Sequence, residues 1–329
     1  MMYEDKYHNS DLSKYSFLVT GGAGFIGSHL VEYLIKYKAG KVRIIDNLST
    51  GYVKNIAPFK SEKSFEFIEA DIRDLKVCSE ACQGINYVFH QAALGSVPRS
   101  IHDPLTTNEV NIDGFLNMLV AARDNKVNRF IYAASSSTYG DSLQLPKVED
   151  QIGQPLSPYA VTKLVNELYA QVFGLHYGLK TIGLRYFNVF GPRQSPEGAY
   201  AAVIPLFINS VINNESPYID GDGEQTRDFT FVENAVQANI KAAFIEDDKA
   251  LNQIYNVAVG ERVSINEMFS YLKKISGSKL EPQYRKARPG DVRDSLADIS
   301  KIGKLLCYRP TINLEKGLKL TFESHKNNQ

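Results

Sequence analysis

Short apolar runs alternate with helical repeats along the first half of the chain. Runs rich in β-branched and aromatic residues predict strands, and segments whose apolar residues recur every three or four positions predict helices. The predicted strands cover 16–20, 41–46, 65–71, 87–92, 129–135 and 180–191. The predicted helices cover 25–37, 75–84, 108–125 and 157–178. This alternation indicates βαβ units and a parallel sheet with helices on both faces.

The pattern changes after Gly191, where loops and short, mixed strands and helices replace the regular alternation. We therefore expect an α/β protein in which a doubly wound parallel sheet carries a smaller, mixed α/β substrate-binding domain. The sheet domain should span 16–190, with 226–256 returning to it. The smaller domain should consist of 191–225 and 257–329. Residues 1–15 should form an N-terminal extension that is loosely held or adds a helix.

The composition is that of an ordinary globular protein, with 43% hydrophobic and 22% charged residues and a net charge of zero. No basic block favours nucleic acid or an acidic membrane as a partner. The three cysteines form no CxxC pair and the six histidines show no ligand spacing, so we expect neither a disulfide framework nor a bound metal. Neither a signal peptide nor a membrane-spanning run is evident, so we expect a cytoplasmic protein.

A glycine-rich loop joins the first predicted strand to the first predicted helix. The stretch VTGGAGFIGSHL places Gly21, Gly24 and Gly27 where a Rossmann-type fold binds the pyrophosphate of a dinucleotide at a helix N-terminus. Asp46 ends the second strand, nineteen residues after Gly27. A carboxylate there accepts hydrogen bonds from ribose hydroxyls and repels a 2′-phosphate, which favours NAD over NADP. Asp71, at the end of the third strand, could bind the adenine amino group or cap a turn.

Later in the chain, Ser135, Tyr159 and Lys163 form a set suited to removing a proton from an alcohol. Tyr159 and Lys163 are four residues apart on one face of a predicted helix that begins with Ser157 as N-cap and Pro158 in its first turn. A lysine ammonium and a positive nicotinamide ring would lower the tyrosine pKa, so that Tyr159 can act as a base. Ser135, at the end of a strand, can hold the same substrate oxygen.

The serines in AASSSTYG, Ser135, Ser136 and Ser137, could form a solvated turn, a nucleophile or a hydroxyl platform. No histidine or glycine elbow surrounds them, which argues against a nucleophile.

With these motifs the chain resembles the extended short-chain dehydrogenases/reductases, in particular the NAD-dependent nucleotide-sugar epimerase/dehydratase family. The resemblance covers roughly residues 16–325 and rests on TGGAGFIGSHL, DNLSTG, DIRD, HQAA, SPYAVTK, NVFGPR, GDGEQTRDF and RPGDVRDSLAD. Within the family the chain is most similar to bacterial UDP-N-acetylglucosamine 4-epimerases of surface-polysaccharide biosynthesis. HQAALGSVPRS, AASSSTYG, LRYFNVFGPRQSPEGAYAAVIP and YNVAVG carry this closer similarity.

The resemblance implies a reaction as well as a fold. Sugar 4,6-dehydratases of the family have Asp and Glu at the positions of Ser136 and Ser137, and UDP-glucuronate decarboxylases have Glu at the position of Ser137. Serines cannot supply that acid and base, so what remains is oxidation at C4 and return of the same hydride to the other face. In this isomerase reaction Tyr159 would take the proton of the 4-hydroxyl while hydride passes to tightly bound NAD+.

The resemblance also implies binding residues. Asn188, Arg227 and Arg288 would hold the nucleotide diphosphate, although each arginine alone could be part of a surface salt bridge. Ser295, where a tyrosine stands in epimerases limited to glucose and galactose, would leave room for a 2-acetamido group, unless it is simply an exposed serine. The remaining sugar and nucleotide contacts are expected from Gly95, Ser96, Ser136, Ser137, Gln194, Ala202, Val203, Tyr218, Ile219 and Asp291. The expected NAD contacts are Gly21, Gly24, Phe25, Ile26, Gly27, Asp46, Asn47, Ser49, Thr50, Gly51, Asp71, Ile72, Gln91, Ala92, Ala93, Asn111, Tyr159, Lys163 and Phe187.

Some alternatives stay open. The substrate could be UDP-N-acetylglucosaminuronic acid instead of UDP-N-acetylglucosamine, and UDP-glucose could be a side substrate. A non-catalytic, cofactor-sensing regulator on the same fold would typically lack the tyrosine or the lysine, and both are present. The family's homodimers pair two helices, here 108–125 and 158–177, in a four-helix bundle, and the apolar outer faces of these segments permit such a dimer.

Overall fold

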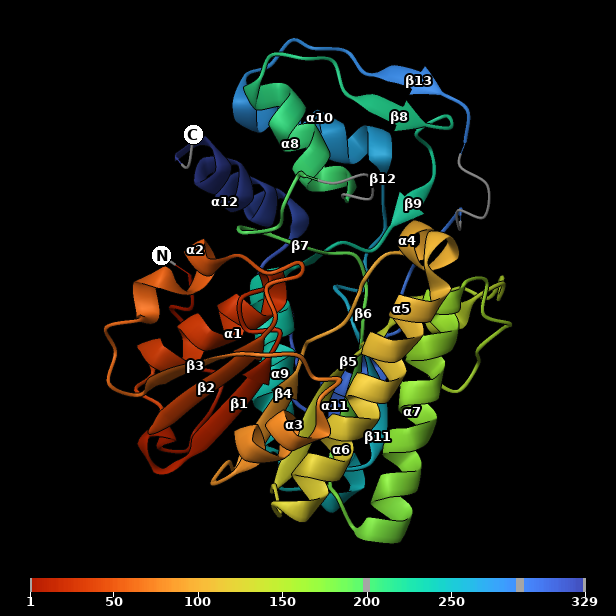
Figure 1. Ribbon diagram of the computed structural model, residues 1–329. Coiled ribbons are helices and arrows are strands. Elements are labelled where there is room, and N and C mark those ends of the chain that lie inside the picture. Colours follow the sequence, from red (N-terminus) through yellow and green to blue (C-terminus); the bar gives the residue numbers. More distant parts are fainter. Residues whose placement is uncertain (1, 198–201, 288–292, 328–329) are drawn as a thin grey trace.

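The computed structural model describes residues 2–197, 202–287 and 293–327. Seven parallel strands form its central sheet (Figure 1). In spatial order the strands are β11 (Gln253–Val257), β6 (Thr181–Tyr186), β5 (Arg129–Ser135), β4 (Tyr87–His90), β1 (Ser16–Thr20), β2 (Lys41–Asp46) and β3 (Phe65–Glu69). The strand order reverses between β1 and β4. Doubly wound sheets bind their ligands at this switch point, beyond the carboxyl ends of the strands.

Helices cover both faces of the sheet, as the strand–helix alternation predicts. One face packs against α1 (Phe25–Lys36), α9 (Val232–Phe244) and α11 (Ser300–Leu305), and the other against α3 (Leu75–Cys82), α6 (Gly114–Asp124) and α7 (Pro158–Tyr177). Neighbouring residues of β1 serve opposite cores, because Phe17 and Val19 point to the first face and Leu18 to the second. Burial on both faces explains why the inner strands β1 (SFLVT) and β4 (YVFH) are almost entirely apolar, whereas the edge strand β3 (FEFIE) alternates and has no buried residue.

A smaller region lies above the sheet in Figure 1 and has its own core, which includes Phe207, Phe229, Met268 and Leu318. Its helices are α8 (Val203–Ile212), α10 (Ile265–Ser276) and α12 (Leu314–Asn327). Its strand pairs are β7 (Val189–Phe190) with β10 (Thr230–Phe231), β8 (Tyr218–Asp220) with β13 (Gln283–Arg285), and β9 (Thr226–Arg227) with β12 (Val263–Ser264). Of the helices in the described ranges, none is long and apolar enough to cross a membrane.

The predicted helix over 108–125 is confirmed, but it contains a π-helical turn. Helical residues run without a gap from α5 (Pro104–Asn108) through this turn at Glu109–Asp113 into α6 (Gly114–Asp124). Asn111 lies in this turn and exchanges hydrogen bonds with the backbone of Leu94 and with the Thr162 hydroxyl. These contacts come from distant parts of the chain, so the local periodicity did not reveal them.

The N-terminal extension is also different from the expectation, because it is neither loosely held nor a full helix. It contains one 3-10 turn, at Leu12–Lys14. Tyr3, Tyr7 and Leu12 are buried in the same core as α1 and α9. The extension is therefore part of the folded sheet domain's core.

Candidate active site

The glycine loop closes tightly between β1 and α1. Gly21 has a φ of +68°, and a Cβ added to Gly27 would lie 2.1 Å from the Gly21 carbonyl oxygen, so only glycine fits there. Gly24 is the N-cap of α1 and provides no side-chain cap. The first N–H groups of the helix therefore remain available for an anion such as a pyrophosphate.

Two carboxylates stand at the ends of the neighbouring strands. Asp46 accepts hydrogen bonds from the N–H groups of Ala23 (2.9 Å) and Leu48 (2.8 Å), and burial raises its pKa. Each carboxylate oxygen has a further lone pair, which a ribose hydroxyl can use. Asp71 accepts from the Arg73 backbone and side chain, which lowers its pKa to about 2. Asp71 therefore caps a turn and also lines the cavity described next.

One cavity of about 570 Å³, the first cavity, joins the glycine loop to the predicted reactive centre. Its wall runs from Gly21 and Asp46 to Ser135, Tyr159 and Lys163. The residues present fit a dinucleotide: helix N–H groups for the pyrophosphate, a carboxylate for the adenosine ribose, and a tyrosine–lysine pair at the other end. Where the structure is described, no group of three or more His, Cys, Asp or Glu residues could hold a metal ion.

The reactive centre is assembled from a strand end and a helix start. Ser157 caps α7 by accepting from the Ala160 N–H (3.2 Å), which fixes the turn that carries Tyr159. Lys163 follows one turn later, and its Nζ donates to the Ala133 carbonyl (2.8 Å) and lies 5.9 Å from the Tyr159 ring centre. Ser135 Oγ accepts from the backbone N–H (3.1 Å) and the hydroxyl (2.9 Å) of Ser137.

Burial pushes the two titrating side chains toward their neutral forms. It raises the pKa of Tyr159, which a hydrogen bond from Ser135 partly offsets. It lowers the pKa of Lys163 to about 8, and the Glu167 carboxylate opposes this shift. Glu167 itself is held in a buried pair with Arg185 at 2.8 Å. A positive charge brought near Tyr159 would favour its phenolate, so the site can accept a proton when a cationic ring is bound.

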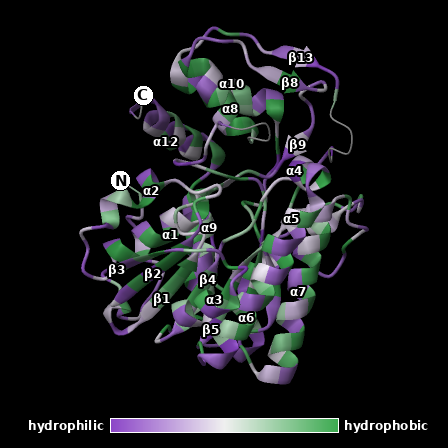
Figure 2. Ribbon diagram, in the orientation of Figure 1, coloured by the Kyte–Doolittle hydropathy of each residue, from purple (hydrophilic) through white to green (hydrophobic). Residues whose placement is uncertain are grey.

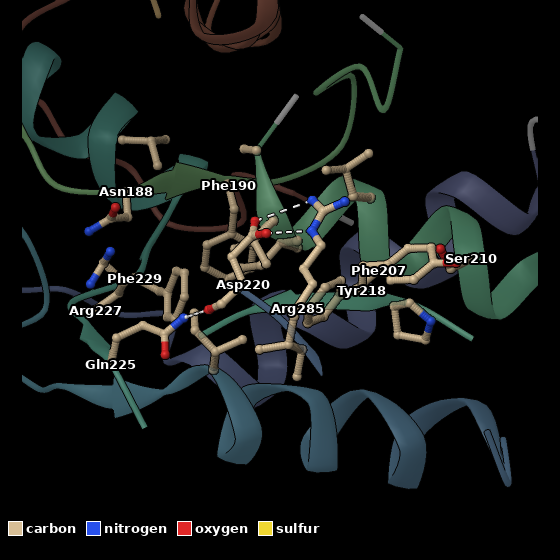
Figure 3. Close-up of a pocket in the computed structure, with 18 residues that line it drawn as sticks. Asn188, Phe190, Phe207, Ser210, Tyr218, Asp220, Gln225, Arg227, Phe229 and Arg285 are labelled. Carbon is tan, nitrogen blue, oxygen red and sulfur yellow. Dashed lines mark hydrogen bonds and ion pairs between the residues drawn. The ribbon is translucent and has the colours of Figure 1, made fainter. Parts of the chain in front are cut away.

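A second cavity, of about 430 Å³, lies in the smaller region and meets the first at Val189 and Ala202. Figure 3 shows Asn188 and Arg227 at one end and an ion pair between Asp220 and Arg285 near the middle. The Asn188 amide donates to the Asp228 carbonyl (3.1 Å), and Arg227 donates to the carbonyls of Thr226 (2.9 Å) and Arg293 (3.0 Å). Polar groups thus surround a largely apolar floor.

Most of the residues predicted from the sequence line these cavities. The first cavity includes Gly21, Gly24, Phe25, Ile26, Gly27, Asp46, Asn47, Ser49, Thr50, Asp71, Ile72, Gln91, Ala92, Ala93, Gly95, Ser96, Ser135, Tyr159, Lys163, Gln194 and Ala202. The second includes Asn188, Ala202, Val203, Tyr218, Ile219 and Arg227.

Six predicted residues line neither cavity: Gly51, Asn111, Ser136, Ser137, Phe187 and Ser295. Asn111 is buried with Leu94 and Thr162, and Phe187 is fully buried against Tyr139. Ser295 lies close by, because its N–H donates to the Thr226 carbonyl (3.1 Å) beside Arg227. Arg288 and Asp291 lie outside the described residues.

The cavities also contain polar residues that sequence reasoning missed. Arg99, Ser195 and Glu197 line the first cavity, and Asp220, Gln225 and Arg285 line the second. Arg99 had one usable signal, because it lies three residues after Ser96, in the short helix α4 (Val97–His102) that follows β4. Arg285 had none, since its place depends on the pairing of β13 with β8.

Comparison with known proteins gives consistent matches over nearly the whole chain. The model of the NAD dependent epimerase/dehydratase family matches residues 17–258. The chain is similar to the UDP-N-acetylglucosamine 4-epimerase of Methanobrevibacter ruminantium, solved with UDP-N-acetylmuramic acid (40% identity, TM-score 0.91, 96% of this chain and 99% of that one). It is also similar to the UDP-glucose 4-epimerase of Thermotoga maritima, solved with UDP-glucose (38% identity, TM-score 0.89, 95% of this chain and 99% of that one). A third similar structure is the UDP-glucuronic acid 4-epimerase of Bacillus cereus with UDP-glucuronic acid and NAD (34% identity, TM-score 0.89, 95% of this chain and 100% of that one).

Proposed function

The chain belongs to the NAD-dependent epimerase/dehydratase family, and we propose that it is a UDP-N-acetylhexosamine 4-epimerase that interconverts UDP-N-acetylglucosamine and UDP-N-acetylgalactosamine. The observation that carries this proposal is the continuity of the first cavity, which joins the glycine loop to Ser135, Tyr159 and Lys163. The M. ruminantium relative, a UDP-N-acetylglucosamine 4-epimerase, supports the sugar class. UDP would occupy the second cavity, with its diphosphate near Asn188 and Arg227.

Each side chain of the reactive centre would have its own role in the transfer of hydride and proton. Bound NAD supplies the hydride acceptor and donor for C4 of the sugar. Tyr159 takes the proton of the 4-hydroxyl and later returns it, and the Lys163 ammonium stabilises the phenolate meanwhile. Ser135 donates its hydroxyl hydrogen to the same sugar oxygen. Ser136 and Ser137 cannot protonate or deprotonate a carbon or a leaving group, so elimination at C6 is disfavoured.

The walls of the first cavity leave room for a 2-acetamido group. A Cβ added to Gly95 would meet no atom within 4 Å, and Ala202 is a small residue where the two cavities meet. Ser295 would add to this space from the neighbouring segment. A substrate with an N-acetyl group is therefore favoured over UDP-glucose.

A second candidate substrate, UDP-N-acetylglucosaminuronic acid, is favoured by Arg99. Arg99 is half-buried and lines the first cavity, and its guanidinium makes no hydrogen bond or ion pair with any described residue. A substrate carboxylate would give this cation a partner, because an arginine fork binds carboxylates through paired hydrogen bonds. The B. cereus relative acts on a UDP-uronic acid.

A product assay separates the candidates. The purified protein is incubated with UDP-N-acetylglucosamine, UDP-glucose or UDP-N-acetylglucosaminuronic acid without added cofactor, and the C4 epimers are separated by chromatography. Fastest conversion of UDP-N-acetylglucosamine supports the proposal, whereas fastest conversion of the uronic acid supports the second candidate. Conversion of UDP-glucose alone would contradict both.

Arg99→Met sharpens this test. If Arg99 binds the carboxylate, the variant loses about tenfold to hundredfold more kcat/KM for the uronic acid than for UDP-N-acetylglucosamine, as expected for one charge-assisted hydrogen-bonded pair. An equal loss for both sugars would remove the argument for the second candidate.

We also propose that the protein acts as a homodimer paired through the outer face of α7. The support is an apolar stripe on that helix, formed by Val161, Leu168, Val172 and Leu175, all of which are exposed. Their spacing places them on one side of the helix. Figure 2 shows apolar positions along the outside of α7.

A further inference from the structure

The N-terminal segment reaches a fixed position across α1. The Tyr3 N–H donates to Glu233 Oε1 (3.1 Å), the Tyr37 hydroxyl donates to the Tyr3 carbonyl (3.0 Å), and Lys36 Nζ donates to the Met2 carbonyl (3.0 Å). Tyr3 is fully buried, and its φ of +59° is a costly conformation for a large side chain. Such strain persists only where the surroundings hold the residue firmly, so the direction of the Tyr3 side chain is well defined.

The Tyr3 hydroxyl leads through a histidine to a backbone carbonyl in another part of the chain. It lies 2.6 Å from His29 Nδ1, and His29 Nε2 lies 2.8 Å from the Pro192 carbonyl oxygen. His29 is fully buried, and burial lowers its pKa to about 3, so the ring is neutral and carries one proton. The carbonyl can only accept, so that proton must be on Nε2, and Nδ1 must accept from the tyrosine hydroxyl.

The Pro192 carbonyl thus sets the tautomer of His29, and the Tyr3 hydroxyl stabilises that tautomer by donating to Nδ1. Glu32 Oε2 lies 3.8 Å from Nδ1 and would favour the other tautomer, with the proton on Nδ1. In that tautomer the Nε2 lone pair would face the Pro192 carbonyl oxygen, and the two acceptors would repel each other. With Tyr3 in place, Glu32 instead pairs with Arg193, the residue after Pro192.

Pro192 belongs to a loop that faces the first cavity. Gln194 and Ser195 line that cavity, and the Gln194 N–H donates to the Gly191 carbonyl (3.3 Å), so the cavity-facing residues move with the Pro192 peptide. We propose that Tyr3 and His29 are positioning residues, through which the N-terminal segment fixes the loop 191–195 against the sugar end of the first cavity. The kinetic part of its test rests on the proposed function.

The test compares two matched tyrosines of the N-terminal segment. Tyr3→Phe removes the hydroxyl that binds His29. Tyr7→Phe removes a buried hydroxyl that donates to Glu233 Oε1 (2.8 Å), which also accepts from the Tyr3 N–H, but this hydroxyl makes no hydrogen bond to His29 or to the loop 191–195. Both variants should lose some thermal stability and should keep their bound NAD. Tyr3→Phe should raise the KM for the UDP-sugar about threefold to tenfold, the size expected for one hydrogen bond, and Tyr7→Phe should change it less than about twofold. Equal KM values in the two variants would overturn the proposal.

His29→Gln tests whether Tyr3 acts on the loop 191–195 through His29. A glutamine amide always carries donor hydrogens, so its contact with Pro192 does not depend on Tyr3. Adding Tyr3→Phe to His29→Gln should therefore leave the KM unchanged. If the KM rises by the same factor as in the wild-type background, Tyr3 acts independently of His29 and the proposal is wrong.

The tautomer itself can be measured without turnover. In the 15N NMR spectrum of the wild-type protein, His29 should show a protonated Nε2 and an unprotonated Nδ1, and Tyr3→Phe should shift the proton toward Nδ1. A wild-type His29 with the proton on Nδ1 would refute the proposed contact from Tyr3 through His29 to Pro192, whatever the substrate is. A protein that turns over none of the UDP-sugars would instead refute the proposed function. The NMR result would then decide whether Tyr3 acts on Pro192 through His29.

Discussion

Tyr159 is the side chain on which the proposed chemistry depends most directly. It lies within hydrogen-bonding reach of Ser135 and one helical turn before Lys163. Tyr159→Phe removes the proton acceptor and leaves the cavity's shape intact. Turnover should fall at least about hundredfold, the range for loss of a general base, while NAD stays bound. Product formation and NAD content, measured on the same sample, test this.

The matched control for Tyr159→Phe is Tyr169→Phe. Tyr169 lies on the same helix but packs against the core instead of lining either cavity. This variant should keep most of its activity. Unchanged turnover in Tyr159→Phe would show that another group takes the proton.

Ser295 gives a second prediction at the residue scale. It is half-buried and its N–H is bonded to Thr226, next to Arg227 in the second cavity. A tyrosine at this position should fill the space for the acetamido group. Ser295→Tyr should lose conversion of UDP-N-acetylglucosamine more than tenfold relative to UDP-glucose, in line with the ~1–3 kcal/mol that one misfitting group costs. Rates with the two sugars measure this ratio.

Ser295→Ala separates size from hydrogen bonding. It removes the hydroxyl without adding volume, so the ratio between the two sugars should stay close to that of the wild type. If Ser295→Tyr leaves the ratio unchanged, Ser295 does not limit the size of the sugar and the size argument is wrong.

At the scale of elements, Asp228 connects the segment between β9 and β10 to two other loops. Its carboxylate accepts from the N–H groups of Val259 (3.0 Å), Gly260 (3.1 Å) and Ala297 (3.3 Å). Burial raises its pKa from 3.8 to about 6, despite these hydrogen bonds. A single side chain thus holds together segments that border both Arg227 and Ser295.

This shift predicts a pH dependence of stability. A carboxyl whose pKa is higher in the folded state binds its proton more tightly there. Its contribution is therefore greatest below about pH 4 and is lost as the pH rises to about 6. Two pKa units correspond to about 3 kcal/mol. Asp228→Asn cannot titrate, so its unfolding free energy should lack this decrease. Urea unfolding of both proteins between about pH 4 and pH 7 tests this, and a constant difference across that range would contradict it.

The elements also show what the sequence could predict and why. Asp46 and Ser135 end strands, and the glycine loop and Asp71 follow strand ends, and parallel strands bring their carboxyl ends to one edge of the sheet. Local periodicity was therefore enough to place them together. The π-helical turn at Asn111 depends on contacts with Leu94 and Thr162, which no local pattern contains.

The same reasoning explains the missed residues. Arg99 reaches the first cavity from the short helix α4 (Val97–His102), whose N-cap, Ser96, has a φ of +125°. Tyr3 is buried because Glu233 and His29, far along the chain, provide its partners. A polar N-terminal segment looks loosely held until these partners are known.

At the scale of the whole molecule, α7 connects the active site to the surface. Its first two turns carry Tyr159 and Lys163, and its outer face exposes Leu168 and Leu175, the latter by 77%. Large apolar side chains in a row on a helix surface are typical of an interface. In Figure 1, α5, α6 and α7 lie side by side and form one face of the molecule, which a second copy could cover.

Two charges on this face should therefore prevent dimerisation. Leu168→Glu combined with Leu175→Glu places four carboxylates in the symmetric interface of a dimer, where their burial without partners is unfavourable. Light scattering after gel filtration should give a dimer mass for the wild type and a monomer mass for the variant. Val53→Glu, which changes an exposed valine on the distant α2 (Val53–Ile56), should remain dimeric. A double variant that still dimerises would place the interface elsewhere. A monomeric wild type would show that there is no such interface. In either case α7 would hold Tyr159 and Lys163 through contacts within one chain alone.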